Sequence, residues 1–123
     1  MQKIETSRRR KPFSVLATTR VAQAAMMVLP PGESTGEVQN EHPKSEQWLY
    51  VVAGAGVATI NKRKIRLKAQ SLLLIEKGEP HQIRNSGRQP LVTLNFYAPP
   101  AYSKEGDVLF RAKSWRDRLN SRK

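Results

Sequence analysis

Residues 36–54 read GEVQNEHPKSEQWLYVVAG, and the end of this stretch gives the clearest indication of the architecture. Residues 48–53 are aromatic, β-branched or otherwise apolar, a composition that favours a β-strand. Gly54 and Gly56 then predict a tight turn. Successive side chains of a strand point to opposite faces, so alternate residues share a face. One such set is Gln47, Leu49 and Val51, and the other is Trp48, Tyr50 and Val52.

Further short apolar runs lie on both sides of this strand, and turns that contain glycine or proline separate them. We expect strands at residues 21–29, 57–60, 64–67, 72–75, 82–85 and 91–97. The run Leu72–Ile75 is apolar throughout and is expected to be buried. Many short strands without long helices between them predict an antiparallel sandwich or barrel. A short amphipathic helix is expected at residues 107–119, with Asp107 as its N-cap.

The composition limits the class of protein to which the chain can belong. A chain of 123 residues and 13.9 kDa fits one domain. It contains no cysteine, which excludes a disulfide scaffold, a thiolate zinc site and a cysteine nucleophile. No apolar run approaches the roughly 18 residues of a membrane span, and the N-terminus lacks the apolar stretch of a secretory signal. We therefore expect a cytoplasmic protein with no membrane partner.

Basic residues are concentrated at the two ends of the chain. The formal net charge is +12, and residues 1–20 and 104–123 together hold +9 of it. We expect residues 1–11 to form a flexible basic segment, residues 12–103 a barrel and residues 104–123 a basic tail. Such ends are either solvated, solubilising segments or a surface that attracts nucleic acid or another polyanion. Five aromatic residues lie in strand-like runs and not among Lys and Arg, which disfavours a nucleic-acid stacking platform; they are Phe13, Trp48, Tyr50, Phe96 and Tyr97.

The chain contains two histidines, His42 and His81. His42 lies in residues 36–54, and His81 lies in residues 70–85, which read QSLLLIEKGEPHQIRN. These two stretches resemble the two motifs of the cupin superfamily, and the resemblance extends over about residues 36–97. It implies an all-β double-stranded β-helix, or jelly-roll barrel, of two antiparallel sheets. It also implies an inward set of core residues, namely Leu49, Val51, Leu73 and Leu94.

The resemblance assigns a role to four polar residues. The first cupin motif has a His-x-His pair followed by a Glu, and here Asn40, His42 and Gln47 fall on those three positions. His81 falls on the histidine of the second motif. The resemblance therefore implies a barrel-interior site for a divalent transition metal such as Zn, Ni, Mn or Fe. Its ligands would be His42, His81, Gln47 and Asn40.

This donor set departs from the usual cupin set of three histidines and one carboxylate. Two imidazoles and two neutral carboxamides bring no negative charge to a divalent cation, and amide oxygens are weak ligands for transition metals. Glu46 and Glu41 have the wrong strand parity to replace the missing carboxylate. The alternative is that His42 and His81 are polar residues that line the cavity without a metal.

Three functions are compatible with the sequence, and no catalytic residue can be assigned. The first is a metal-dependent enzyme that acts on a sugar-like or small polar substrate. The second is a non-catalytic cupin that binds a small polar or anionic ligand beside a degenerate metal site. The third is a polyanion-binding module that uses its basic tails. A homodimer is expected, because residues 15–29 offer an unpaired strand that needs covering, and Trp48 and Tyr50 suit outer-face packing or a dimer contact.

Overall fold

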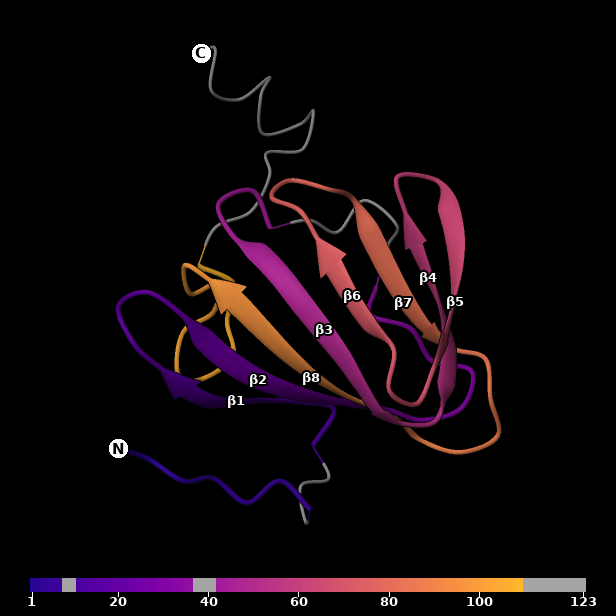
Figure 1. Ribbon diagram of the computed structural model, residues 1–123, viewed down its shortest axis with the longest axis horizontal. Helices are drawn as coiled ribbons and strands as arrows, with labels where there is room; N and C mark the ends of the chain where they lie inside the picture. Colours follow the sequence, from indigo (N-terminus) through magenta and orange to yellow (C-terminus); the bar gives the residue numbers. More distant parts are fainter. Residues whose placement is uncertain (8–10, 37–41, 110–123) are drawn as a thin grey trace.

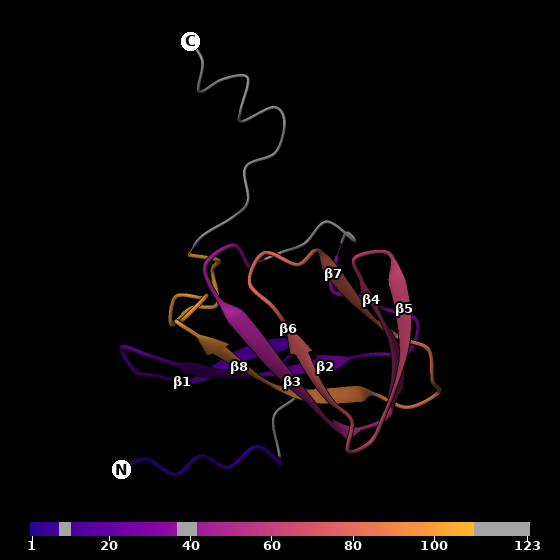
Figure 2. The ribbon, with the colours of Figure 1, turned by 45° about the horizontal axis from the view of Figure 1, so that its top comes forward.

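The computed structural model describes residues 1–7, 11–36 and 42–109. Their strands are β1 (Phe13–Thr18), β2 (Gln23–Leu29), β3 (Glu46–Ala53), β4 (Ala55–Ile60), β5 (Arg63–Lys68), β6 (Leu72–Ile75), β7 (His81–Asn85) and β8 (Leu91–Ala98). A five-stranded sheet has the order β1-β2-β8-β3-β6, and a three-stranded sheet has the order β5-β4-β7. Every pairing is antiparallel, and the two sheets stand against each other (Figures 1 and 2). The predicted all-β fold of two antiparallel sheets is confirmed.

The first two strands form a hairpin inside the larger sheet. The hydroxyl of Thr19 accepts hydrogen bonds from the backbone N–H groups of Val21 at 3.2 Å and Ala22 at 3.1 Å, which closes the turn. Strand β2 therefore begins at Gln23, later than predicted. It pairs with β1 on one side and with β8 on the other. Residues 15–29 fold back on themselves, and β1 forms an edge of the larger sheet, so one side of β1 has no strand partner among the described residues. The homodimer expected from this stretch stays a prediction.

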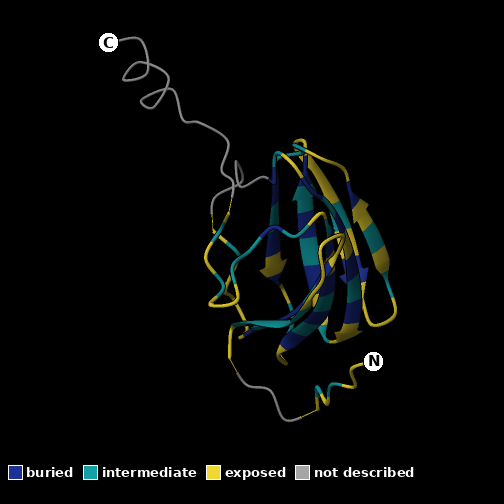
Figure 3. Ribbon diagram, turned by 90° about the vertical axis from the view of Figure 1, so that its left-hand side faces the viewer, coloured by how far each residue is buried: buried dark blue, intermediate teal, exposed yellow. Residues whose placement is uncertain are grey.

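The hydrophobic core lies between the two sheets. Along β3 the side chains of Gln47, Leu49 and Val51 are buried, which confirms that this set faces inward. Leu91 of β8 and Ile83 of β7 belong to the same core cluster and bring in both sheets. Figure 3 shows buried residues alternating with more exposed ones along the strands. The strand period of two therefore separates a core face from an outer face.

Leu94 is not part of this core. Its register partner in the sheet is Tyr50, on the outer face of β3, so Leu94 also faces outward. Leu73, by contrast, is opposite Leu49 and packs partly buried against the core, as expected. The inward positions of β8 are Leu91, Thr93, Asn95 and Tyr97. The prediction for Leu94 is wrong because polar residues occupy the inward face at that end of the strand.

The expectation that Leu72–Ile75 is buried throughout is also wrong. Ile75 is 2% exposed, but Leu72 is 62% and Leu74 is 39% exposed. Strand β6 is one of the two edge strands of the larger sheet, and only its inner face packs against the core. An all-apolar run cannot reveal this by periodicity, since it gives no alternation to read.

Gly54 joins the two sheets at a corner. It connects β3 of the larger sheet to β4 of the smaller one. Its φ is +91°, and a Cβ at this position would lie 2.5 Å from the carbonyl oxygen of Pro90. Glycine alone tolerates both the positive φ and the close approach. The corner therefore lets one continuous stretch supply both walls of the barrel.

Residues 99–109 fold back against the barrel. Gln23 holds this segment, since its Nε2 donates to the Tyr102 carbonyl at 2.8 Å and its Oε1 accepts from the N–H groups of Ala101 and Tyr102. The hydroxyl of Ser45 also donates to the Pro99 carbonyl at 2.7 Å. The helix expected at residues 107–119 does not begin at Asp107, because Val108 forms an antiparallel β-bridge with Tyr102. From residue 110 onward the stretch lies outside the described residues. None of the described residues forms a helix that could span a membrane.

Candidate functional site

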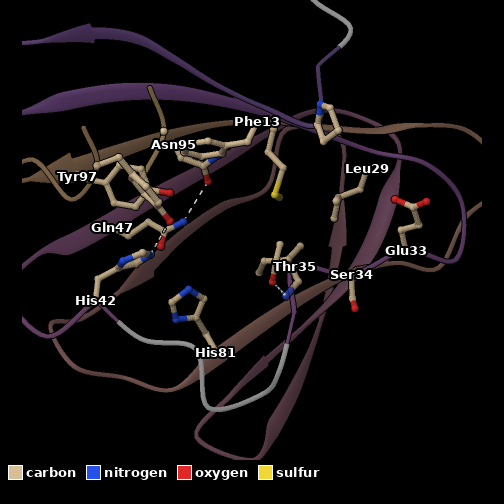
Figure 4. A pocket seen from close by; sticks show the side chains of 15 residues that line it. Phe13, Leu29, Glu33, Ser34, Thr35, His42, Gln47, His81, Asn95 and Tyr97 are labelled. Carbon is tan, nitrogen blue, oxygen red and sulfur yellow. Dashed lines mark hydrogen bonds between the residues drawn. The ribbon is translucent and has the colours of Figure 1, made fainter. Parts of the chain in front are cut away.

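A cavity of about 380 Å³ opens between the two sheets. Phe13, Met27, Leu29 and Ile83 give it apolar walls. Its polar lining residues are Glu33, Ser34, Thr35, His42, Gln47, His81, Asn95, Tyr97 and Tyr102. Figure 4 shows His42, His81 and Gln47 gathered at one end of the cavity, whereas Glu33 and Ser34 lie at the other end. The predicted site residues therefore meet at the end of the cavity that holds the imidazoles, which is called the polar end below (Figure 4).

The two histidines come together from distant parts of the chain. The centroids of the His42 and His81 rings are 5.4 Å apart, and both side chains are buried. His81 is the first residue of β7, whereas His42 lies in the connection that enters β3 and not on a strand. Asn40, the remaining predicted ligand, lies outside the described residues.

Gln47 presents a fixed carboxamide to this end of the cavity. Its Nε2 donates to Oδ1 of Asn95 at 3.1 Å, and Nδ2 of Asn95 donates to the Thr93 hydroxyl at 3.0 Å. These bonds set the orientation of both amides. The Gln47 Oε1 atom is buried and has no hydrogen-bond partner. This oxygen therefore lacks the hydrogen bond that a buried polar atom usually makes.

His42 has one ring nitrogen engaged and one without a partner. Its Nε2 lies 3.2 Å from the hydroxyl of Tyr102, and its Nδ1 is buried with no hydrogen-bond partner. Burial, and secondarily the neighbouring His81, lower the pKa of His42 to about 4. The imidazole is therefore neutral at physiological pH, which is the form that binds metal ions.

The orientation of His81 is set by the backbone. Its Nδ1 lies 3.0 Å from the carbonyl oxygen of Glu79. Because a carbonyl oxygen only accepts hydrogen bonds, this contact assigns the ring proton to Nδ1 and leaves the lone pair on Nε2. Metal-binding histidines are commonly oriented by such a bond from the other ring nitrogen.

Three residues of the polar end were not predicted as site residues. They are Asn95, Tyr97 and Tyr102. The alternation along β8 contains the signal for two of them, since Thr93, Asn95 and Tyr97 share a face. Tyr102 has no such signal, because it arrives by the fold-back of residues 99–109. Burial raises the pKa of both phenols, and Tyr102 raises that of Tyr97 further. Both are therefore protonated hydrogen-bond donors at neutral pH.

The cavity carries little formal charge. In a chain of net charge +12, no Lys or Arg is among the described residues that line it. Glu33 is the carboxylate residue among the described lining residues, and it lies at the end away from the histidines (Figure 4). An anionic ligand would therefore find no protein cation in the described walls.

The described residues at the polar end of the cavity offer nitrogen and oxygen donors but no carboxylate (Figure 4). Across residues 1–7, 11–36 and 42–109, no group of three or more His, Cys, Asp or Glu could hold a metal ion. The set consists instead of two imidazoles and an amide oxygen. The buried His42 Nδ1 and Gln47 Oε1 atoms have no other partner, which suits ligation. A neutral set of this kind binds transition metals less tightly than one with a carboxylate.

Comparisons with known proteins agree with this architecture. A model of the cupin domain matches residues 25–97. The tetracenomycin polyketide synthase protein TcmJ of Streptomyces glaucescens is 37% identical over 62 residues, which are 50% of this chain and 40% of that protein. An oxalate-binding protein of Thermotoga maritima is 34% identical over 67 residues, 54% of each protein. The chain thus spans about half the length of these curated relatives.

Solved structures extend the likeness to the whole barrel. The Bacillus halodurans protein BH2720 superposes with a TM-score of 0.73 at 30% identity, and the match covers 82% of this chain and 79% of that one. Solved proteins with a double-stranded β-helix also match, which confirms the predicted fold class. The family model covers more than half of the chain, so the protein belongs to the cupin superfamily as a small domain.

Proposed function

We propose that the cavity binds a small oxygen-rich ligand, such as a carboxylate or a sugar-like molecule, through a divalent transition metal held by His42, His81 and Gln47. One observation carries the proposal. Three residues from separate segments bring nitrogen and oxygen lone pairs to one end of the cavity, and two of these atoms are buried without a partner. Leaving such atoms unsatisfied costs about 1–3 kcal/mol each, which a bound ion would offset.

The ligating atoms follow from the hydrogen bonds. They are His42 Nδ1, His81 Nε2 and Gln47 Oε1. This assignment requires the His42 tautomer that carries its proton on Nε2 and donates it to the Tyr102 hydroxyl oxygen, 3.2 Å away. The low pKa of His42, about 4, keeps that ring neutral. When bound, the metal supplies a positive centre that polarises an oxygen of the ligand. Asn40 stays a predicted further ligand.

The charge of the cavity favours a ligand whose anionic group meets the metal. The described walls contain no Lys or Arg, so the metal would be the partner of a carboxylate. A curated relative that is 34% identical is named an oxalate-binding protein, which supports a small dicarboxylate as a ligand. The Tyr97 phenol donates a hydrogen bond to the Tyr102 phenol, so the Tyr102 hydroxyl would be the one to donate to a ligand oxygen. Binding of an anion should then depend on the metal.

The proposed activity is binding, and catalysis has no assigned residue. Glu33, the described carboxylate of the lining, lies at the opposite end of the cavity from the imidazoles (Figure 4). A general base must lie within hydrogen-bond reach of the proton that it removes. An enzyme acting on a sugar-like substrate is therefore the less supported form of this proposal.

Calorimetric titration of untagged, metal-stripped protein tests the proposal. We expect Zn²⁺, Ni²⁺, Mn²⁺ or Fe²⁺ to bind one per chain, and oxalate to bind the metal-loaded protein but not the stripped one. His42→Ala should abolish both events. Ser34→Ala, which changes the far end of the same cavity, is the matched control and should leave metal binding intact. Oxalate binding without metal, or metal binding that survives His42→Ala, contradicts the proposal.

A second candidate function, polyanion binding, is favoured by one face of the smaller sheet. The register places Arg66 and Arg84 on either side of Val57, on the outer face. Lys64 and Lys68 share that face, and all four cations are exposed. We propose that this face, together with the basic ends of the chain, attracts a polyanion such as nucleic acid.

Heparin or duplex DNA affinity as a function of salt tests this second candidate. The double variant Arg66→Glu, Arg84→Glu should weaken binding and reduce its salt dependence. Deletion of residues 1–11 measures the contribution of the basic N-terminal segment in the same assay. Binding that is absent at low salt, or that is insensitive to salt, removes this candidate.

A further inference from the structure

The cavity is larger than the ligand that its polar end requires. Its volume is about 380 Å³, which lies within the range of about 300–1,000 Å³ that is typical of pockets for ligands of drug size. Oxalate, with two carbons and four oxygens, would occupy the polar end alone. The rest of the cavity is therefore room for a further part of the ligand.

Apolar side chains from both sheets line that further part. Phe13 of β1 is opposite Met27 of β2, and Leu29 follows Met27 on the same face of the strand. Ile83 of β7 supplies the wall from the smaller sheet. All four side chains belong to the hydrophobic core or pack against it. These four residues are called the apolar subsite below.

The apolar subsite begins beside the imidazoles. The ring centroids of Phe13 and Tyr102 are 4.6 Å apart, and the Tyr102 hydroxyl lies 3.2 Å from Nε2 of His42. On the facing sheet, Ile83 comes two residues after His81 and shares its inward face. At a strand rise of about 3.3 Å per residue, Ile83 is roughly 7 Å farther along the wall than His81. A ligand anchored near His81 therefore reaches the apolar subsite with a side chain of that length.

The far end of the cavity disfavours a second negative charge on the ligand. Glu33 lies at that end (Figure 4), and its carbonyl oxygen accepts a hydrogen bond at 2.9 Å from the N–H of Asn85, two residues beyond Ile83. Among the described lining residues there is no Lys or Arg. A carboxylate carried past Ile83 would meet the Glu33 carboxylate and no cation. The ligand therefore carries its negative charge at the polar end alone.

We propose that the cavity accepts a 2-hydroxy or 2-oxo monocarboxylate whose apolar, ring-sized side chain lies in the apolar subsite. The inference rests on the proposed function, because the metal at His42, His81 and Gln47 holds the acid group. The head of such an acid offers two adjacent oxygens, as oxalate does. Its side chain leaves water for a wall of hydrophobic residues, which favours binding. The metal thus anchors the acid, and the apolar subsite selects its side chain.

Calorimetric titration of the untagged, zinc-loaded protein with three acids that share one head group tests the inference. They are lactate, 3-phenyllactate and 2-hydroxyglutarate, each as both enantiomers. We expect phenyllactate to bind roughly 30-fold tighter than lactate, since burial of an aromatic ring is worth about that factor. 2-Hydroxyglutarate should bind no tighter than lactate, because its second carboxylate meets no cation in the described walls. The metal-free protein should bind none of the three.

Met27→Gln tests the apolar subsite itself, because it introduces a carboxamide at nearly constant side-chain size. It should weaken phenyllactate binding roughly tenfold and leave lactate binding within about twofold. Met26→Gln is the matched control. Met26 is 6% exposed and Met27 is 8% exposed, but Met26 does not line the cavity. The control should keep both affinities, and circular dichroism establishes that each variant is folded.

Nuclear Overhauser contacts in the zinc complex give a readout that needs no variant, and we expect them between the phenyllactate ring and the methyl groups of Ile83. Zinc that fails to bind overturns the proposed function and this inference together. Zinc binding with equal affinities for lactate and phenyllactate, or with affinity for neither, overturns this inference alone. So does a folded Met27→Gln chain that keeps the wild-type ratio of the two affinities, or a bound ring without contacts to Ile83.

Discussion

At the scale of single residues, His42 is the side chain of the site whose surroundings disfavour a positive charge. It is 5% exposed, it faces a second imidazole, and one of its ring nitrogens has no hydrogen-bond partner. A neutral imidazole tolerates this environment, whereas an imidazolium ion does not, because burial disfavours the charged form. The residue is therefore suited to hold a ligand that brings positive charge, and it is poorly suited to carry that charge itself.

The same environment makes stability depend on pH. The folded-state pKa of His42 is about 4, below the 6.5 of an unperturbed histidine, so between these values the unfolded chain binds more protons than the folded one. The contribution of His42 is full above pH 6.5 and is lost as pH falls through that window to about 4. Its size is about 3 kcal/mol, at 1.36 kcal/mol for each pKa unit.

Urea unfolding of the metal-free protein at pH 7 and at pH 4 measures this effect. Carboxylates also titrate in that range, so the useful quantity is the difference between wild type and His42→Gln. We expect wild type to lose about 3 kcal/mol more unfolding free energy than the variant does. Equal losses in the two proteins would mean that His42 is not buried as a neutral group.

At the scale of single strands, alternation accounts for what the sequence could predict. The inward face of β3 was predicted from the spacing of Gln47, Leu49 and Val51 together with the cupin resemblance, and the structure confirms it. The same reasoning failed for Leu94, because an apolar residue was expected inside. On β8 the inward face is instead polar at Asn95, since this part of the strand lines a cavity and contacts Gln47.

Elements joined by distant contacts could not be predicted. The four apolar residues of β6 have no alternation, so nothing in the run distinguishes the buried Ile75 from the exposed Leu74. Tyr102 reaches His42 because Gln23, 79 positions earlier, binds the backbone beside it. Such a contact depends on tertiary structure alone, and no local pattern reports it.

At the scale of the whole molecule, the two sheets differ in character. Their inner faces share one core, but one outer face is cationic and the other is apolar. The strands of the larger sheet contain no Lys or Arg, and the exposed Trp48 lies between Leu74 and Phe96 there. Composition gave the net charge of +12 and its concentration at the chain ends. Composition cannot predict that the cations lie on the outer face of one sheet and not of the other. Residues of β5 and β7 are far apart in sequence and come together only because β4 pairs with both strands.

The convergence of His42 and His81 is likewise a property of the whole fold. No spacing rule links two residues on different elements, and the expectation that they meet came from the family resemblance. The structure places their ring centroids 5.4 Å apart. A metal titration that follows both imidazoles therefore tests whether the two residues form one site.

The most direct test follows both imidazoles at once during a Zn²⁺ titration. The chain has only two histidines, so a long-range ¹H–¹⁵N correlation spectrum of untagged ¹⁵N-labelled protein contains two ring systems, which His42→Gln assigns. We predict that His42 Nδ1 and His81 Nε2 shift together and saturate at one zinc ion per chain. Rings that respond separately, or a single ring that responds alone, would contradict a shared site.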